Sequence, residues 1–168
     1  PLEARFEMAG LYGTDGLNDI SLSLLTDTLE FQAKGSAVGE GPDLLFSGRE
    51  KDLGKWSFIG GSAISGSATV DGRIAGSWKE PRASIDAVLD QPGLGPFVAS
   101  SAAGHLEVDS KGATLQSVRL EIGGTTLVGE GRYPWDRERG VPAFSVRVTD
   151  GEVQDLLGAA GLEPVVTG

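Results

Sequence analysis

The feature that most constrains the fold is an alternation of residue types from Gly60 to Trp78. The apolar or glycine positions share one parity and are Ile64, Gly66, Ala68, Val70, Gly72, Ile74, Gly76 and Trp78, and the other parity is polar except for Ala75. A period of two residues is typical of a strand with one buried face. A turn at Asp71-Gly72 would set Val70 opposite Arg73 and mix the two faces, so we expect one long strand and a tall, glycine-bent sheet.

Composition supports β architecture and excludes several classes of partner. The 168 residues include 26 glycines, which are scattered through alternating segments. The formal net charge of −10 disfavours nucleic acid or an anionic membrane surface as partner, because both would repel the chain. Without cysteine there is no disulfide, thiolate metal site or cysteine nucleophile, and no apolar run is long enough to span a bilayer. Because the chain opens with Pro1-Leu2-Glu3, we expect it to be part of a longer protein.

Two hairpins follow one pattern. The first predicts a turn at Thr26-Asp27 that pairs Leu24 with Leu29, Leu22 with Phe31 and Ile20 with Ala33. Its apolar positions return 98 residues later, which predicts an internal repeat of residues 17–35 and 115–133, although two amphipathic hairpins can also align by chance. The matched positions are Leu17, Ile20, Leu22, Leu24 and Leu29 with Leu115, Val118, Leu120, Ile122 and Leu127.

Other segments complete the expected sheet. Pro1, Pro81 and Pro142 each open an alternating stretch, a position where a strand tolerates proline. Further strands are expected at 43–49, 55–60, 101–109 and 113–122, a loop at 91–96 and a short helix at 152–161. Trp78 has the apolar parity of its strand and is expected to pack, and Trp135 is expected to cover an edge.

The sequence contains no recognisable catalytic arrangement. His105 is the only histidine, which excludes a multi-histidine metal site but leaves a Ser/His/Asp arrangement formally possible. Its parity, opposite to that of Leu106, predicts an exposed strand residue. No Gly-x-Ser-x-Gly segment joins a strand to a helix, and no helix follows the glycine-rich segment 35–41. We therefore expect no enzyme, metal or cofactor; if the chain were an enzyme, His105 would be its general base.

Residues 71–85, DGRIAGSWKEPRASI, join a Gly-x-Ile-x-Gly strand end to a proline-opened amphipathic strand. This segment resembles the repeating signature of the TamB and AsmA-like envelope proteins, and the order of the later elements, 115–122, 127–133 and 142–148, is similar. The resemblance implies a periplasmic protein, anchored in the inner membrane of a diderm bacterium by a segment outside this chain. It implies phospholipid transport between membranes and an outer-membrane barrel protein as a further partner.

These observations predict an all-β chain with an elongated, curved sheet that forms an open half-pipe, an apolar concave face and a short C-terminal helix. The alternative is a β-sandwich, or a solenoid module that binds protein or glycan. In the half-pipe, acyl chains would lie on Ile20, Leu22, Leu24, Leu29, Phe31, Val118, Leu120, Ile122 and Leu127. An exposed apolar trough and free strand edges also predict self-association.

Overall fold

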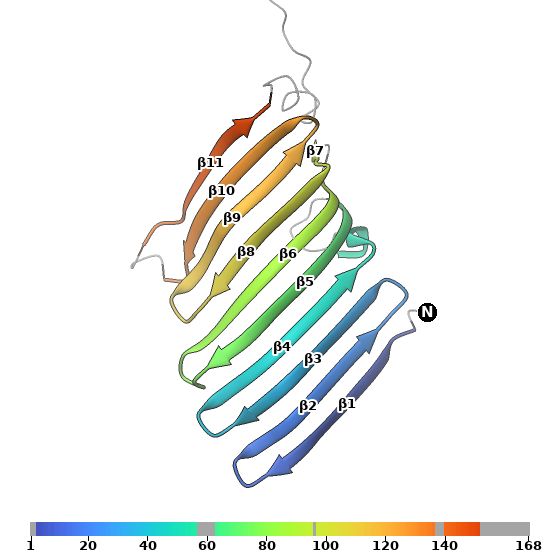
Figure 1. Ribbon diagram of the computed structural model, residues 1–168, viewed down its shortest axis with the longest axis vertical. Helices are drawn as coiled ribbons and strands as arrows, with labels where there is room; N and C mark the ends of the chain where they lie inside the picture. The colour runs from blue at the N-terminus through green and yellow to red at the C-terminus, as the bar shows by residue number, and fades with distance from the viewer. Residues whose placement is uncertain (1–2, 57–62, 96, 137–139, 152–168) are drawn as a thin grey trace, which may run out of the picture.

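A computed structural model describes residues 3–56, 63–95, 97–136 and 140–151, which form one open β-sheet (Figure 1). The elements are β1 (Arg5–Gly13), β2 (Gly16–Leu25), β3 (Leu29–Val38), β4 (Gly41–Glu50), the 3₁₀ helix η1 (Leu53–Trp56), β5 (Ile64–Gly76), β6 (Pro81–Leu94), β7 (Phe97–Val98), β8 (Ser101–Val108), β9 (Gly112–Ile122), β10 (Thr125–Pro134) and β11 (Ala143–Asp150). The ten long strands lie side by side in chain order, every neighbouring pair is antiparallel, and β7 pairs with the end of β6. The all-β, open-sheet prediction is confirmed, and the described residues form a single sheet instead of a sandwich.

The long alternating segment is a single strand, as its parity predicted. β5 runs for 13 residues through Asp71 and Gly72 without a turn. Gly72 lies opposite Phe46 on one side and Ile85 on the other, so the apolar parity of β5 meets the apolar parity of both neighbours. β6 begins at Pro81, where the missing amide is tolerated at the first residue of a strand.

The first hairpin has the predicted face but a different register. Leu24 pairs with Phe31, Leu22 with Ala33 and Ile20 with Gly35, so the partner strand is shifted by two residues from the prediction. The shift follows from the turn, where the Thr26 hydroxyl accepts hydrogen bonds from the amides of Thr28 and Leu29 at 3.2 and 2.9 Å. The turn is centred on Asp27-Thr28, one residue later than predicted, and the amide of Thr26 donates to the carbonyl of Leu29 at 2.8 Å, so Leu29 lies opposite Thr26 instead of Leu24. Because the shift is two residues, each side chain keeps its face.

Four β-bulges interrupt the ladder, in β2, β6, β9 and β11. Their extra residues include Asp19, Gln91 and Ser117, with φ values of 50°, 47° and 52°. Asp19 and Ser117 lie 98 residues apart, at equivalent positions of the segments 17–35 and 115–133. A bulge increases the local twist and bends its strand, so these positions set the curvature of the sheet.

Several local predictions were wrong. Residues 55 and 56 of the expected strand 55–60 belong to η1, and the rest of that segment lies outside the described residues. The expected loop at 91–96 is largely taken up by the end of β6. Trp78 lies in the β5–β6 turn and is 61% exposed, so it does not pack. The predicted helix at 152–161 lies outside the described residues.

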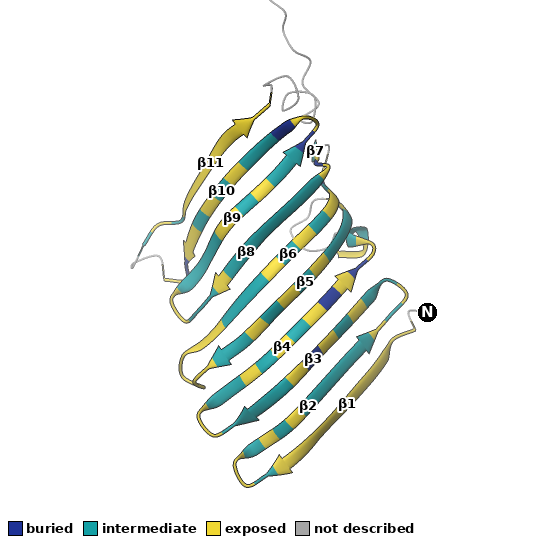
Figure 2. Ribbon diagram, viewed as in Figure 1, coloured by how far each residue is buried: buried dark blue, intermediate teal, exposed yellow. Residues whose placement is uncertain are grey.

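The sheet has almost no enclosed core. Among the described residues, the buried hydrophobic side chains are Ala33, Ala99 and Ile122. Along the central strands, half-buried residues alternate with exposed ones, whereas β1 and β11 are exposed over nearly their whole length (Figure 2). A single layer produces this pattern, because each side chain is covered by its neighbours on adjacent strands and by no second sheet.

Candidate ligand-binding face

The nine residues predicted to bind acyl chains all lie on one side of the sheet. Directly paired residues in antiparallel strands share a face, and Leu22 and Leu24 pair with Ala33 and Phe31. In the second hairpin, Leu120 pairs with Leu127 and Val118 with Gly129. Pairing across the intervening strands places both hairpins on the same face, which we call the apolar face.

The apolar face continues across the whole sheet in rows of paired residues. One row crosses ten strands and consists of Met8, Leu22, Ala33, Phe46, Gly72, Ile85, Leu106, Leu115, Gly131 and Phe144. A second row consists of Leu29, Glu50, Ala68, Leu89, Ala102, Leu120, Leu127 and Val148. Two further rows, from Phe6 to Gly104 and from Ile20 to Tyr133, contain no charged residue. The two predicted hairpins are therefore parts of one continuous surface.

This surface is large and has no described element packed across it. Each strand contacts its immediate neighbours, and η1 contacts β5. At the typical strand spacing, ten strands span roughly 43 Å, and four rows make the face roughly 1,000 Å². The largest apolar patch on an ordinary monomer is about 300–600 Å². The apolar face therefore exceeds the apolar patch of an ordinary monomer and is the candidate binding surface.

Aromatic rings on the apolar face lie over glycines of adjacent strands. A methyl group at Gly72 would fall 2.3 Å from Cζ of Phe46, and one at Gly131 would fall 2.3 Å from Cδ1 of Phe144. The rings of Phe31 and Phe46 stack with centroids 6.2 Å apart and planes inclined by 29°. The glycines thus leave room for the rings to lie along the sheet, which makes the face smoother than upright rings would.

Glu50 is the one charged residue in these rows of described residues, and it is 7% exposed. Its carboxylate accepts hydrogen bonds from Nε1 of Trp56 at 2.8 Å and from the amide of Asp52 at 2.9 Å. Burial alone would raise the pKa of Glu50, but these hydrogen bonds, with one from Thr28, stabilise the ionised form and lower the pKa below its ordinary value of 4.5. Glu50 therefore attaches η1 to the end of β4.

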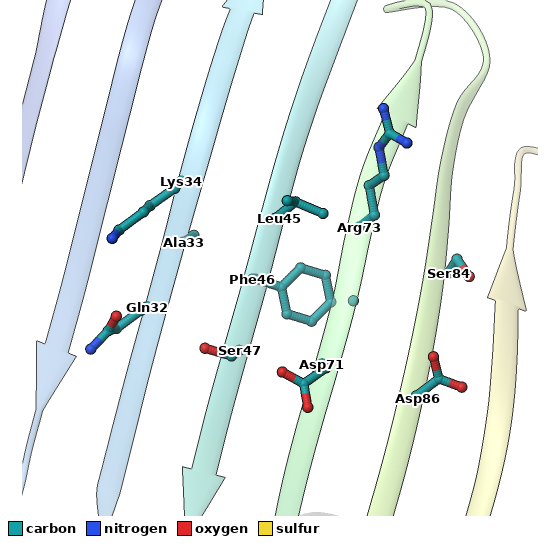
Figure 3. Close-up of a pocket in the computed structure, with 11 residues that line it drawn as sticks. Gln32, Ala33, Lys34, Leu45, Phe46, Ser47, Asp71, Arg73, Ser84 and Asp86 are labelled. Atoms are coloured by element: carbon teal, nitrogen blue, oxygen red, sulfur yellow. The ribbon is translucent and has the colours of Figure 1, made fainter.

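The opposite face is polar and carries a shallow hollow of about 560 Å³ between β3 and β6. Figure 3 shows the lining side chains, which include Lys34, Arg73 and Asp86. Beside the hollow, Arg73 donates two hydrogen bonds to Asp43 at 2.7 and 2.8 Å. This pairing lowers the pKa of Asp43 and raises that of Arg73. Both groups remain exposed to water.

His105 lies on the polar face, as its parity predicted, but its side chain is half-buried instead of exposed, because it has several partners. Nδ1 is 2.7 Å from Asp86, and Nε2 is 3.3 Å from both Ser84 and Glu107. Hydrogen bonds to Asp86 and then to Glu107 raise the pKa of His105 above 6.5. The spacing from Ser84 through His105 to Asp86 is that of a proton relay, yet Glu107 favours a protonated Nε2, which cannot accept the serine proton.

Sequence reasoning missed the central part of the apolar face. Phe46, Val70, Ile85 and Leu106 join the two predicted hairpins into one surface. Alternation in the segments 43–49 and 83–89 carried the necessary signal, but the predicted site was taken from the two hairpins. The β4–β5–β6–β8 register is what unites the separate patterns.

No family model matches the chain, and no curated protein or solved structure is significantly similar to it. Within the described ranges, no helix is long and apolar enough to cross a membrane. The same residues contain no cluster of histidine and acidic side chains suited to a metal ion. The two faces of the sheet are therefore the features that bear on function.

Proposed function

We propose that the apolar face binds the acyl chains of phospholipids and that the chain is a segment of a lipid-conducting envelope protein. The observation that carries this proposal is the row of apolar and glycine residues that crosses all ten strands. Acyl chains need a continuous dry surface and few directional partners. In the same proposal the protein lies in the periplasm, carries phospholipid between the inner and outer membranes, and aids outer-membrane protein assembly with a barrel protein as partner.

The dimensions of the face suit this ligand. One leaflet of the hydrocarbon core is about 15 Å thick, half of a ~30 Å bilayer core, so a face roughly 43 Å wide accommodates more than one chain end to end. Binding by burial of apolar area contributes about 25 cal/mol per Å² with little chemical specificity. A conduit requires this combination, because a ligand held by specific polar contacts would not slide.

Strand parity provides the test. A photo-crosslinking residue at Leu22 or Leu120 lies on the apolar face, whereas one at Ser21 or Arg119 lies on the polar face opposite Lys34 or Val128. With phosphatidylcholine or phosphatidylethanolamine vesicles, we expect phospholipid adducts at the first pair and few at the second. Equal labelling at both parities, or none at either in folded protein, would contradict the proposal.

A charge on the apolar face provides a second test. Leu120→Arg puts a cation among apolar neighbours, at a cost of several kcal/mol unless the side chain reaches water, so lipid binding should fall. Ser21→Arg is the matched control and should leave it unchanged. Lipid binding that survives Leu120→Arg would contradict the proposal.

A protein- or glycan-binding module is the second candidate. It is favoured by Trp78 and Trp135, which are 61% and 53% exposed, because exposed tryptophans often mediate contacts with sugars or proteins. Trp135 is partly fixed, since its Nε1 donates to the carbonyl of Asp109 at 2.8 Å. Glycan binding that Trp78→Ala abolishes, in protein that captures no lipid, would favour this candidate.

A further inference from the structure

We propose that two copies of this chain join head to tail, with β1 of one molecule pairing antiparallel to β11 of the next in a single register that sets Glu7 opposite Arg147. No described strand pairs with the outer edge of β1 or of β11. Such edges present unpaired amide and carbonyl groups and readily add another strand. The proposal concerns these edges and does not depend on what the apolar face binds.

Strand direction permits this contact. The path from β1 to β11 has ten strands with every neighbouring pair antiparallel, so β1 and β11 run in opposite directions. A second copy placed beyond β11 in the same orientation therefore presents β1 antiparallel to it. The same orientation also keeps the apolar faces of both copies on one side, so the joined sheet has one continuous apolar face.

The side chains of the two edges complement each other on that face. Phe6 and Met8 of β1 are 63% and 72% exposed, and Val146 and Val148 of β11 are 71% and 48% exposed. When Met8 lies opposite Val146, Phe6 lies opposite Val148. Each pair removes apolar surface from water, and directly opposed side chains of this kind stabilise a sheet.

On the polar face, the same register pairs opposite charges. Glu7 forms an exposed ion pair with Arg5 of its own strand, and the two side chains are 60% and 77% exposed. Arg147 lies opposite Val128 and forms no ion pair with a described residue. Across the proposed junction, Glu7 would meet Arg147 directly and still reach Arg5.

Neighbouring registers are less favourable. A shift of two residues in one direction sets Arg5 opposite Arg147, which places like charges together. The opposite shift sets Ala9 opposite Arg147 and leaves Glu7 opposite Thr149. A shift of one residue puts Glu7 on the same side as Val146 or Val148 and turns the apolar faces away from each other. Charge and parity together select one register.

Because this contact joins different surfaces, it does not close on itself. Heterologous contacts generate open assemblies, and the twist of the sheet would make these helical. We therefore expect a concentration-dependent series of species in sedimentation velocity instead of a single dimer.

Charge reversal tests the register. Glu7→Arg and Arg147→Glu should each raise the dissociation constant of the junction about three- to tenfold, as expected for a cross-strand pair turned from attraction to repulsion. The double variant should return it to near the original value. Asp71→Arg, on central strand β5, makes the same change in net charge as Glu7→Arg and should not weaken assembly. Monomeric protein at every concentration, or a double variant no better than the singles, would overturn the proposal.

Cysteine pairs provide an independent measure of the register, because the chain has no cysteine of its own. Oxidation of protein with both Met8→Cys and Val146→Cys should yield a ladder of linked oligomers on a denaturing gel. In the variant with Met8→Cys and Phe144→Cys, the second cysteine lies two residues along β11 from the position opposite Met8. The Cα atoms of the two cysteines are then beyond the usual separation for a disulfide, and the variant should link poorly. Equal ladders would reject the register, and efficient linking through Leu22→Cys alone would indicate that the apolar faces stack instead.

Discussion

Alanine at Gly72 should destabilise the sheet, whereas alanine at Gly131 should not. A methyl group at Gly72 would lie 2.3 Å from Cζ of Phe46 and 2.6 Å from the backbone oxygen of Ser84. The Phe46 ring can turn, but the Ser84 oxygen belongs to β6, so the strands themselves must separate. Overpacking of this kind costs about 1–3 kcal/mol.

Gly131 is the matched control, because the three atoms nearest to its methyl group all belong to the ring of Phe144, the closest two at 2.3 and 2.7 Å. Phe144 lies on edge strand β11 and is 67% exposed, so its ring can move into water. Replacing glycine by alanine also restricts the unfolded chain and contributes about 0.4–1 kcal/mol of stability where the backbone accepts it. The two effects nearly offset each other, and we expect a change within about 0.5 kcal/mol.

Urea denaturation followed by circular dichroism measures both variants. With a slope of about 2 kcal/mol per M, Gly72→Ala should lower the midpoint by roughly 0.5–1.5 M, and Gly131→Ala should leave it nearly unchanged. An unchanged midpoint for Gly72→Ala would refute the reasoning, as would an equal loss for Gly131→Ala, because the backbone contact is what distinguishes the two sites.

Three further predictions concern single side chains. Ser117 has a φ of 52°, a left-handed conformation that glycine adopts without strain. Ser117→Gly should therefore stabilise the protein by roughly 0.5–1 kcal/mol after the entropic cost of glycine is subtracted. A lower denaturation midpoint would contradict this. Glu50 has a lowered pKa, so its contribution to stability is present above pH 4.5 and is lost as the pH falls through the folded value. Glu50→Gln should make the free energy of unfolding less dependent on pH in this acidic range. An unchanged dependence would contradict the lowered pKa of Glu50. The raised pKa of His105 predicts an NMR titration midpoint above 6.5 that Asp86→Asn lowers more than Glu107→Gln; its contribution to stability is present below pH 6.5 and is lost as the pH rises through the folded value.

The face of each residue was predictable from the sequence, but its partner was not. Alternation defines parity, which a two-residue shift leaves unchanged, so Leu22 and Leu24 lie on the predicted side although their partners differ from those expected. The partner depends on the turn, where the Thr26 hydroxyl competes for backbone amides. Trp78 shows the same limit, because its parity is that of β5 but the strand ends at Gly76. That the two hairpins belong to one continuous apolar face depends on the register between neighbouring strands. Alternation within a single strand does not specify that register.

A sheet in which each strand is held mainly by its immediate neighbours distributes its stability unevenly. β1 and β11 each have one partner strand and exposed side chains, whereas β5 and β6 are the longest strands, at 13 and 14 residues, and each has partner strands on both sides. Local opening should therefore begin at the outer strands and move inward, as in other quasi-one-dimensional proteins. Amide protons would then exchange in order of their distance from the edges, and the slowest would belong to the β5–β6 pair.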